Sequence, residues 1–421
     1  MSDFHQEGII TTLHALYDVF DREEYLIGLE QKLEEYSRHT RISLLLPCLY
    51  SEMLNPQVLD LIVDEKIQKV RYLNSVVVAL GGAIEESKFK EAKEYFGQLI
   101  TPERDVKILW VDGLRIQSIL SDISERKIPT GVQGKGQSVW LALGYLFARE
   151  DSDVIALHDC DILTYNRLLL GRLIEPTANP NNDFEFCKGY YLRISPTERT
   201  MKGRVTRLFV IPFVDTMKQV MHDRGYHELE SFFNYHRTFN YPLAGEVSFT
   251  ARLARGINIA YDWGLEVSTL SEVYHRVIPR KIAQIDLISN YEHKHQVLSP
   301  DDRTKGLHRM VIDIAKFYFN YMRSNGVVLD DAFVEMVRQT YYQNALKFIK
   351  QYSDDAEVND LVFDRHEEEL TAWYFHEFLW TTWKETGEKH EDTQIPSWNR
   401  VLYSIPDIYV KLLKAVDADN A

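Results

Sequence analysis

Four short apolar runs alternate with helix-like stretches along the first 165 residues, and this alternation constrains the fold more than any other feature. The runs are 41–47 (RISLLLP, stopped by its proline), 74–82 (NSVVVALGG), 105–113 (DVKILWVDG) and 153–161 (DVIALHDCD). Helical periodicity fills 56–69, 86–99, 114–124 and 136–149. Strands that alternate with helices form a parallel sheet with helices on its faces. Ligands bind such α/β sheets outside the carboxyl ends of the strands. We therefore expect one crevice lined by 47–52, 81–83, 111–113 and 158–161.

The rest of the chain is less regular and richer in helical patterns. Residues 183–195 alternate like a strand, 241–256 look like a loop entering a helix, 257–277 fit a strand, a turn and a helix, and 281–296 fit a strand that runs into a histidine-rich loop. Helices are expected over 8–38, 204–224, 227–239, 303–325, 330–352, 358–386 and 396–416. We predict an N-terminal helical segment (1–40), an α/β domain (41–300) and a helical C-terminal extension (301–421).

Composition excludes several classes of partner. The chain is 421 residues long, 45% hydrophobic and 26% charged, with a net charge of −15. Nucleic acid and anionic membranes require basic surfaces, so neither is expected to bind. The three cysteines form no CxxC pair and indicate no disulfide framework. The first residues lack the basic and apolar regions of a signal peptide. No run reaches the roughly twenty apolar residues of a membrane span, so we expect a cytoplasmic protein.

Two carboxylates, Asp159 and Asp161, come directly after the fourth apolar run. Residues two apart in a strand point the same way, so both carboxylates can face one hard cation and the phosphates that it holds. Solvated loop acids or helix caps would give the same pattern. The position at the end of a buried strand, where ionised groups need compensation, favours a metal site.

A glycine-rich segment, 130–136 (TGVQGKG), opens the helix-like stretch before that strand and carries Lys135 between two glycines. Backbone N–H groups and the helix dipole make such a segment attractive to anions. The spacing matches neither a Walker loop nor the dinucleotide fingerprint. A flexible turn with a solvated lysine would explain the same residues. Its place directly before the Asp159–Asp161 strand favours a phosphate or a nucleotide sugar.

Three other segments carry candidate residues. His293 and His295 follow a predicted strand and could ligate manganese or cobalt, or they could be solvated loop histidines. Glu266 lies near a predicted helix start, where it either complements the dipole or projects into the site. Arg204 and Thr206 could hold a phosphate or carboxylate, although a basic helix start on the surface fits equally well.

Taken together, seven segments give a more specific signal: LLLPCLYSE, GKGQSVW, LHDCDIL, GRVTRLF, PLAGEVSF, WGLEVSTLSEVY and YEHKHQ. In this order they resemble the glucosyl-3-phosphoglycerate synthases, above all their archaeal-type branch, over roughly residues 41–310. The chain is also similar, more distantly, to mannosylglycerate synthase. The resemblance implies a retaining glycosyltransferase of the GT-A fold, a Rossmann-like nucleotide-sugar domain with a mainly parallel sheet. It also implies UDP-glucose as donor, 3-phosphoglycerate as acceptor and a divalent cation, with Mg²⁺, Mn²⁺ and Co²⁺ as the candidates.

The resemblance also assigns roles to individual residues. The donor side would comprise Pro47, Leu49 and Glu52 at the nucleotide base and ribose, Lys135 and Asp159 next to them, and Ala244, Gly245 and Glu246 around the transferred sugar. Asp161 and His293 would hold the cation. The acceptor's phosphate would lie against Gly203, Arg204, Val205, Thr206 and His295, and Glu266 would position or deprotonate the acceptor hydroxyl.

The sequence departs from the actinobacterial relatives at several positions. His295 replaces an asparagine, VALGGAIEE (78–86) replaces a Ser-Gly-Ser stretch, and Ala244 stands where relatives often have glycine. Donor and acceptor choice therefore stay open between UDP-glucose and GDP-mannose, and between 3-phosphoglycerate and D-glycerate. A sugar nucleotidyltransferase is the alternative from another class, but it would place its glycine-rich loop after the first strand. A non-catalytic nucleotide-binding module is another alternative. The aromatic segment 371–383 (TAWYFHEFLWTTW) predicts either a homodimer interface or packing within the chain.

Overall fold

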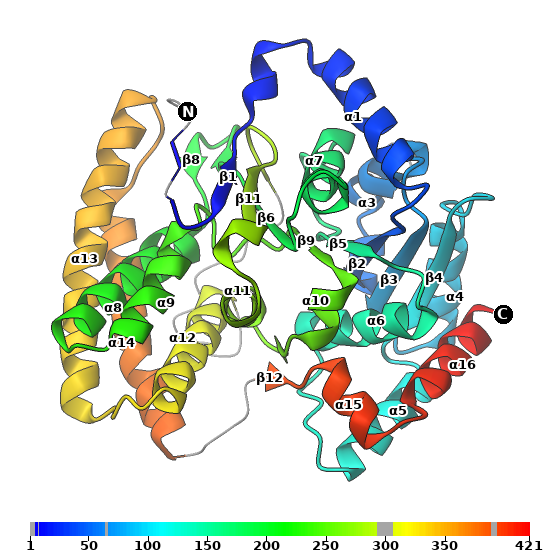
Figure 1. The fold of residues 1–421 in the computed structure, drawn as a ribbon. Coiled ribbons are helices and arrows are strands. Elements are labelled where there is room, and N and C mark those ends of the chain that lie inside the picture. The colour runs from blue at the N-terminus through cyan, green and yellow to red at the C-terminus, as the bar shows by residue number, and fades with distance from the viewer. Residues whose placement is uncertain (1–4, 7, 64–65, 293–305, 389–393) are drawn as a thin grey trace.

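The computed structural model describes residues 5–6, 8–63, 66–292, 306–388 and 394–421. Its centre is an eight-stranded sheet with the order β1-β11-β6-β9-β5-β2-β3-β4, in which β9 alone runs antiparallel to its neighbours (Figure 1). The strands are β1 (Thr11–Leu13), β2 (Ile42–Leu49), β3 (Ser75–Gly81), β4 (Asp105–Trp110), β5 (Val154–Leu157), β6 (Phe186–Tyr190), β9 (Val247–Thr250) and β11 (Ile282–Asp286). Two small ribbons pair β7 (Ile194–Ser195) with β8 (Thr200–Met201), and β10 (Ile259–Ala260) with β12 (Gln394–Ile395). The α/β fold with a mainly parallel sheet agrees with the fold class predicted from the sequence.

Helices cover both faces of this sheet because the strands are apolar on both sides. In β2, Leu44 and Leu46 pack into one core while Leu45 packs into the other, as the two-residue period of a strand requires. The first core contains α1 (Arg22–Tyr36), α3 (Pro56–Val63), α4 (Glu86–Gly97) and α7 (Arg167–Ala178). The second contains α5 (Leu114–Glu125), α6 (Lys135–Arg149), α10 (Ala251–Gly256) and α11 (Leu265–Arg276). The short helix α2 (Tyr50–Met53) follows β2 directly.

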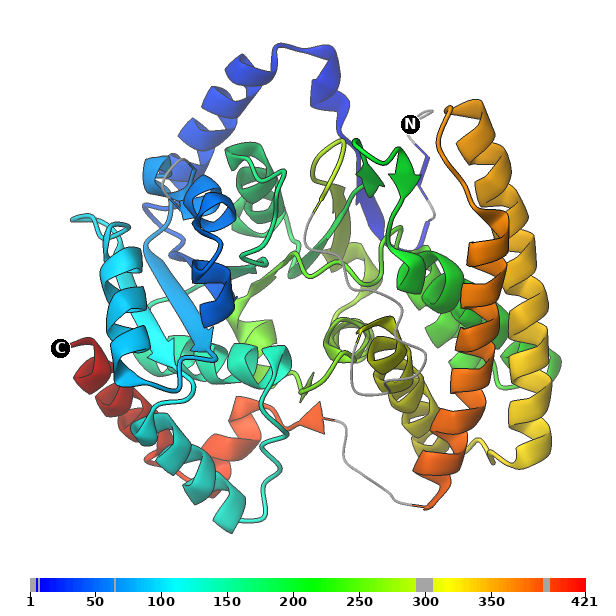
Figure 2. The ribbon, with the colours of Figure 1, turned by 180° about the vertical axis from the view of Figure 1, so that it is seen from behind.

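A third hydrophobic core lies beside the sheet and is built mainly from helices. It joins α8 (Ile211–Asp223), α9 (His227–Thr238), α12 (Gly306–Ser324), α13 (Asp331–Val358) and α14 (Arg365–Glu388) to the π-helical turn Val205–Val210. Figures 1 and 2 show this cluster at the edge of the molecule opposite α4 and the C-terminus.

The last helices leave that cluster and return to the sheet. Helix α16 (Ile408–Asn420) packs against α5, α6 and β4, and α15 (Trp398–Ser404) packs against α10 and α16. Trp398 stacks on Trp140 of α6 with ring centroids 4.4 Å apart, and each indole N–H donates to a backbone carbonyl. At the end of α16, the Asn420 amide bonds both the N–H and the C=O of Ile108 in β4. The predicted extension 301–421 thus contributes to two separate cores, and the predicted domain boundaries stay predictions.

Three expectations from the sequence need correction. Residues 8–38 are not wholly helical, because Thr11–Leu13 pairs in parallel with β11 at the sheet edge. The first strand does not stop at Pro47 but continues to Leu49. Pairing with β5 ends at Leu45 while pairing with β3 continues, so the proline lies where the strand has a partner on one side. Segment 241–256 contains the strand β9, which was expected to be loop and helix only.

The aromatic segment of α14 packs largely within the chain. Ala372, Phe375, Phe378 and Leu379 are buried in the third core, whereas Trp373 stays 43% exposed. Homodimer formation remains a prediction. Within the described residues, no helix combines the length and the apolar character that a bilayer crossing requires.

Candidate active site

A cleft of about 1140 Å³ lies at the carboxyl ends of β2, β3 and β5, where the sequence analysis expects a crevice. The strand order reverses here, because β3 and β4 lie on one side of β2 and β5 on the other. Twelve of the predicted site residues line the cleft: Pro47, Leu49, Glu52, Lys135, Asp159, Asp161, Gly203, Arg204, Val205, Thr206, Gly245 and Glu266. The predicted donor-side and acceptor-side residues therefore share one cavity. The expected segment 111–113 is not part of its lining.

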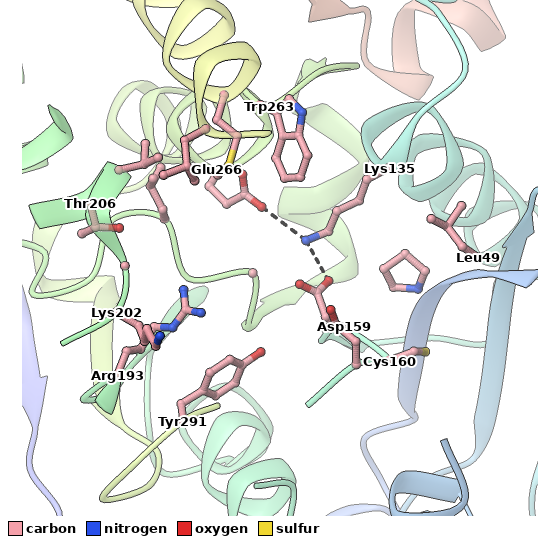
Figure 3. Close-up of a pocket in the computed structure, with 18 of the residues that line it drawn as sticks. Leu49, Lys135, Asp159, Cys160, Arg193, Lys202, Thr206, Trp263, Glu266 and Tyr291 are labelled. Atoms are coloured by element: carbon pink, nitrogen blue, oxygen red, sulfur yellow. Dashed lines mark hydrogen bonds and ion pairs between the residues drawn. The ribbon is translucent and has the colours of Figure 1, made fainter. Parts of the chain in front are cut away.

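Lys135 joins the two ends of this cavity. Its Nζ lies 2.7 Å from Oδ1 of Asp159 and 3.3 Å from Oε1 of Glu266 (Figure 3). Burial lowers the pKa of Lys135, but the two carboxylates outweigh burial and raise it above its usual value. The lysine thus remains a cation and links the end of β5 to the first turn of α11.

The glycines around Lys135 let its loop approach the 260–261 segment closely. A side chain at Gly136 would place Cβ 2.1 Å from the carbonyl oxygen of Ala260. Gly131 has a φ of +68°, and a Cβ there would lie 2.5 Å from the Tyr261 side chain. This close packing holds Lys135 at the start of α6, within reach of Glu266.

Asp161 lies close to other carboxylates of the cleft. Burial and the carboxylates of Asp159 and Glu52 raise the pKa of Asp161 to about 7. A divalent cation beside Asp161 would offset this excess of negative charge, and carboxylate oxygens suit Mg²⁺ or Mn²⁺. The described part of the chain contains no cluster of three or more His, Cys, Asp or Glu side chains that could hold a metal ion by itself. His293 and His295 lie outside the described residues, so the predicted ligand pair of Asp161 and His293 stays a prediction.

The three residues expected to surround the transferred sugar divide between the surface and the interior. Gly245 faces the cavity, and a Cβ at this position would lie 3.0 Å from both Asp159 Oδ2 and Lys135 Nζ. Ala244 and Glu246 are fully buried. The carbonyl of Ala244 accepts a hydrogen bond of 2.6 Å from Lys188 Nζ.

Glu246 supports two tyrosines that line the cleft. Its carboxylate accepts hydrogen bonds of 2.7 Å from the Tyr191 hydroxyl and 2.6 Å from the Tyr291 hydroxyl. The two rings stack with centroids 3.9 Å apart. Burial and the neighbouring Asp159 raise the pKa of Glu246, against the lowering effect of the tyrosine hydrogen bonds. Glu246 therefore acts on the cleft through the tyrosines that it orients.

The acceptor-side segment enters the cleft from the opposite direction. Figure 3 shows Thr206, Lys202 and Arg193 on one side of the Lys135–Asp159 pair and Leu49 on the other. Gly203 has a φ of +76°, and a Cβ at this position would come within 2.7 Å of the Tyr241 hydroxyl. The glycine therefore lets the chain turn against Tyr241 before the helical turn that carries Thr206.

Several lining residues were missed by the sequence reasoning. Tyr191 and Arg193 follow the end of β6 and could have been found by the strand-end rule that identified Asp159. Trp263 is 39% exposed and stands beside Glu266 in Figure 3. Another part of the wall comes from the C-terminal helices, through Leu307, Met310 and Ile314 of α12 and Glu367 of α14. No local pattern in the sequence distinguishes these four residues.

Comparison with known proteins places the chain in a family. No family model matches the sequence. The chain is 38% identical to a glucosyl-3-phosphoglycerate synthase of Persephonella marina, covering all of both chains. It is 36% identical to one of Methanococcoides burtonii, covering 99% of this chain and 98% of the relative. A crystal structure of the Mycobacterium tuberculosis enzyme of the same name, in complex with Mn²⁺, UDP-glucose and phosphoglyceric acid, has a TM-score of 0.48 at 20% identity, covering 68% of this chain and 81% of that one. Because its full length aligns with relatives above 30% identity, the chain belongs to the glucosyl-3-phosphoglycerate synthase family.

Proposed function

We propose that this protein transfers glucose, with retention, from UDP-glucose to the hydroxyl of 3-phospho-D-glycerate. The observation that carries the proposal is full-length identity of 38% and 36% to proteins named for this synthesis. The cleft supports it, because twelve of the residues assigned to donor, acceptor and cation line one cavity, in which Lys135 pairs with Asp159 and Glu266. We place the reaction in the cytoplasm, which suits three cysteines that are all free and buried.

The donor would lie over the ends of β2 and β5. Pro47, Leu49 and Glu52 would contact the base and ribose, and Asp159 would contact the ribose or the glucose. Asp161 would hold a divalent cation, whose charge would stabilise the diphosphate as it leaves. A Cβ at Gly245 would lie 3.0 Å from both Asp159 Oδ2 and Lys135 Nζ. Because glycine has no side chain, it would leave room for the glucose to approach this ion pair.

The acceptor would enter between the Gly203–Thr206 segment and α11. Glu266 would then position the acceptor hydroxyl, and Lys135 would hold the Glu266 carboxylate toward the donor. The family resemblance implies attack on the same face as the departing phosphate. Double displacement would instead use a carboxylate as the nucleophile.

A donor and acceptor matrix tests this proposal directly. Purified protein with Mg²⁺ or Mn²⁺ is given UDP-glucose, ADP-glucose, GDP-glucose or GDP-mannose, each with 3-phosphoglycerate, D-glycerate or no acceptor, and nucleoside diphosphate release is measured. We expect release with UDP-glucose and 3-phosphoglycerate, with an α-linked product by NMR, and its loss in Asp161→Ala. Release with GDP-mannose or D-glycerate would move the assignment to the mannosyl or glycerate alternative. Pyrophosphate release from UTP and glucose 1-phosphate would establish a nucleotidyltransferase instead.

A further inference from the structure

The acceptor-side Arg204 is held by two adjacent carboxylates of the C-terminal helix α14. Its Nη2 lies 2.8 Å from Oε1 of Glu367, and its Nε lies 3.1 Å from Oε1 of Glu368. Glu368 also accepts a hydrogen bond of 2.8 Å from Nη1 of Arg207. The two neighbouring groups on one edge of the Arg204 guanidinium, Nε and Nη2, are thus paired with separate carboxylates before any ligand arrives.

The two carboxylates differ in burial and in what they face. The Glu368 side chain is 6% exposed and is shared by two arginines, so its removal from them would leave a buried charge unpaired. The Glu367 side chain is 53% exposed and lines the cleft, whereas Glu368 is not part of the lining. An incoming anion can therefore replace Glu367 but not Glu368.

We propose that Glu367 is a displaceable counter-ion of Arg204, which the phosphate of the acceptor replaces at Nη2 while Glu368 keeps its contact with Nε. This inference rests on the proposed function, because it takes Arg204 as part of the acceptor subsite. It makes Glu367 a determinant of acceptor affinity, supplied by a helix that the sequence did not connect with the site. A phosphate carries more negative charge than a carboxylate and accepts more hydrogen bonds, so it competes effectively for the same N–H groups.

The expected effect follows from the exposure of the pair. Exposed ion pairs are worth about 0.2–1 kcal/mol, which corresponds to a change of about 1.4- to five-fold in an equilibrium constant. Replacing Glu367 by glutamine should therefore tighten 3-phosphoglycerate binding and lower its KM by up to about five-fold. The gain should shrink in about 0.5 M salt, because exposed charges are screened.

The test compares three variants of the full chain, with calorimetric binding of 3-phosphoglycerate and steady-state kinetics as readouts. Glu367→Gln should lower Kd and KM for 3-phosphoglycerate, with a smaller effect on D-glycerate, which lacks the phosphate. Arg204→Ala should weaken 3-phosphoglycerate binding at least ten-fold. Glu369→Gln is the matched control, because Glu369 is the next residue of α14 and pairs with Arg365 instead. It should leave both constants unchanged.

The outcomes separate this inference from the proposed function. Unchanged or weaker binding in Glu367→Gln, with Arg204→Ala still impaired, would overturn the counter-ion role and leave the synthase intact. An equal gain for D-glycerate would refute replacement by the phosphate. Wild-type protein that neither binds nor uses 3-phosphoglycerate would refute the proposed function and this inference with it.

Discussion

Replacing Lys135 by methionine tests the arrangement at the centre of the cleft. Methionine keeps most of the apolar stem and removes the charge. In the wild type, one ammonium group pairs with Asp159 at 2.7 Å and with Glu266 at 3.3 Å. Without it, the two carboxylates lose their shared cation, and Asp159 and Glu266 are no longer held toward each other.

The size of the effect follows from the burial of the three side chains. They are 30%, 22% and 13% exposed for Lys135, Asp159 and Glu266, so solvent screens the pairs only in part. Hydrogen bonds to charged groups contribute about 1.5–3 kcal/mol each. If the loss appears in the transition state, kcat/KM for UDP-glucose should fall by about ten- to 150-fold.

The assay is initial-rate release of UDP at saturating 3-phosphoglycerate, with Lys107→Met as control. Lys107 is similarly exposed, at 27%, and lies 3.8 Å from Asp105 on the edge strand β4, away from the cleft. The control should keep wild-type kcat/KM. If Lys135→Met stays within about three-fold of wild type, Lys135 does not organise the site and the reasoning is wrong.

Three further predictions concern stability. Trp398→Ala should lower the free energy of unfolding by about 3–5 kcal/mol in urea titrations, because the buried indole stacks on Trp140; a loss below 1 kcal/mol would show that the C-terminal helices contribute little. Gly144→Ala should cost about 1–3 kcal/mol by the same measurement, since its Cβ would lie 2.1 Å from the Trp398 ring; wild-type stability would contradict this packing. Burial lowers the pKa of His236 to about 3, so the unfolded chain takes up a proton below pH 6.5 while the folded chain does not. Stability from this group is therefore lost as pH falls, by about 2 kcal/mol between pH 8 and pH 5, and His236→Gln should show a decline smaller by that amount; an unchanged decline would refute the assignment.

The part of the sheet formed by β2, β3, β4 and β5 could be predicted from the sequence, because local patterns determine it. Apolar runs such as 74–82 alternate with amphipathic stretches, and this alternation leads to a parallel sheet and to its ligand-binding edge. Strand β9 was missed because four residues, Val247–Thr250, are too few to show a period. Its place between β5 and β6 is decided by tertiary packing, as is the addition of Thr11–Leu13 to β11.

The same distinction applies to the site. Asp159 and Asp161 were predicted from the strand that precedes them, and Lys135 from the glycines around it. Glu246 was predicted as part of the loop around the transferred sugar, and its burial behind Tyr191 and Tyr291 depends on side chains from distant segments. Nothing in the local sequence indicates which carboxylates of a long helix meet an arginine more than 160 residues away.

The two halves of the cleft can change independently, because different parts of the fold form them. The half of the cleft that we propose for the donor consists of strand ends and helix starts, whose positions are determined by the sheet itself. The half that we propose for the acceptor depends on α12 and α14, which pack in a separate core and contribute Leu307, Met310, Ile314 and Glu367 to the wall. A substitution on these helices can therefore alter the surroundings of Arg204 without disturbing the sheet or the pair of Lys135 with Asp159. Changes in the C-terminal helices should therefore alter acceptor affinity and leave the KM for UDP-glucose unaffected. The Glu367→Gln variant tests this directly, through the KM values for 3-phosphoglycerate and for UDP-glucose.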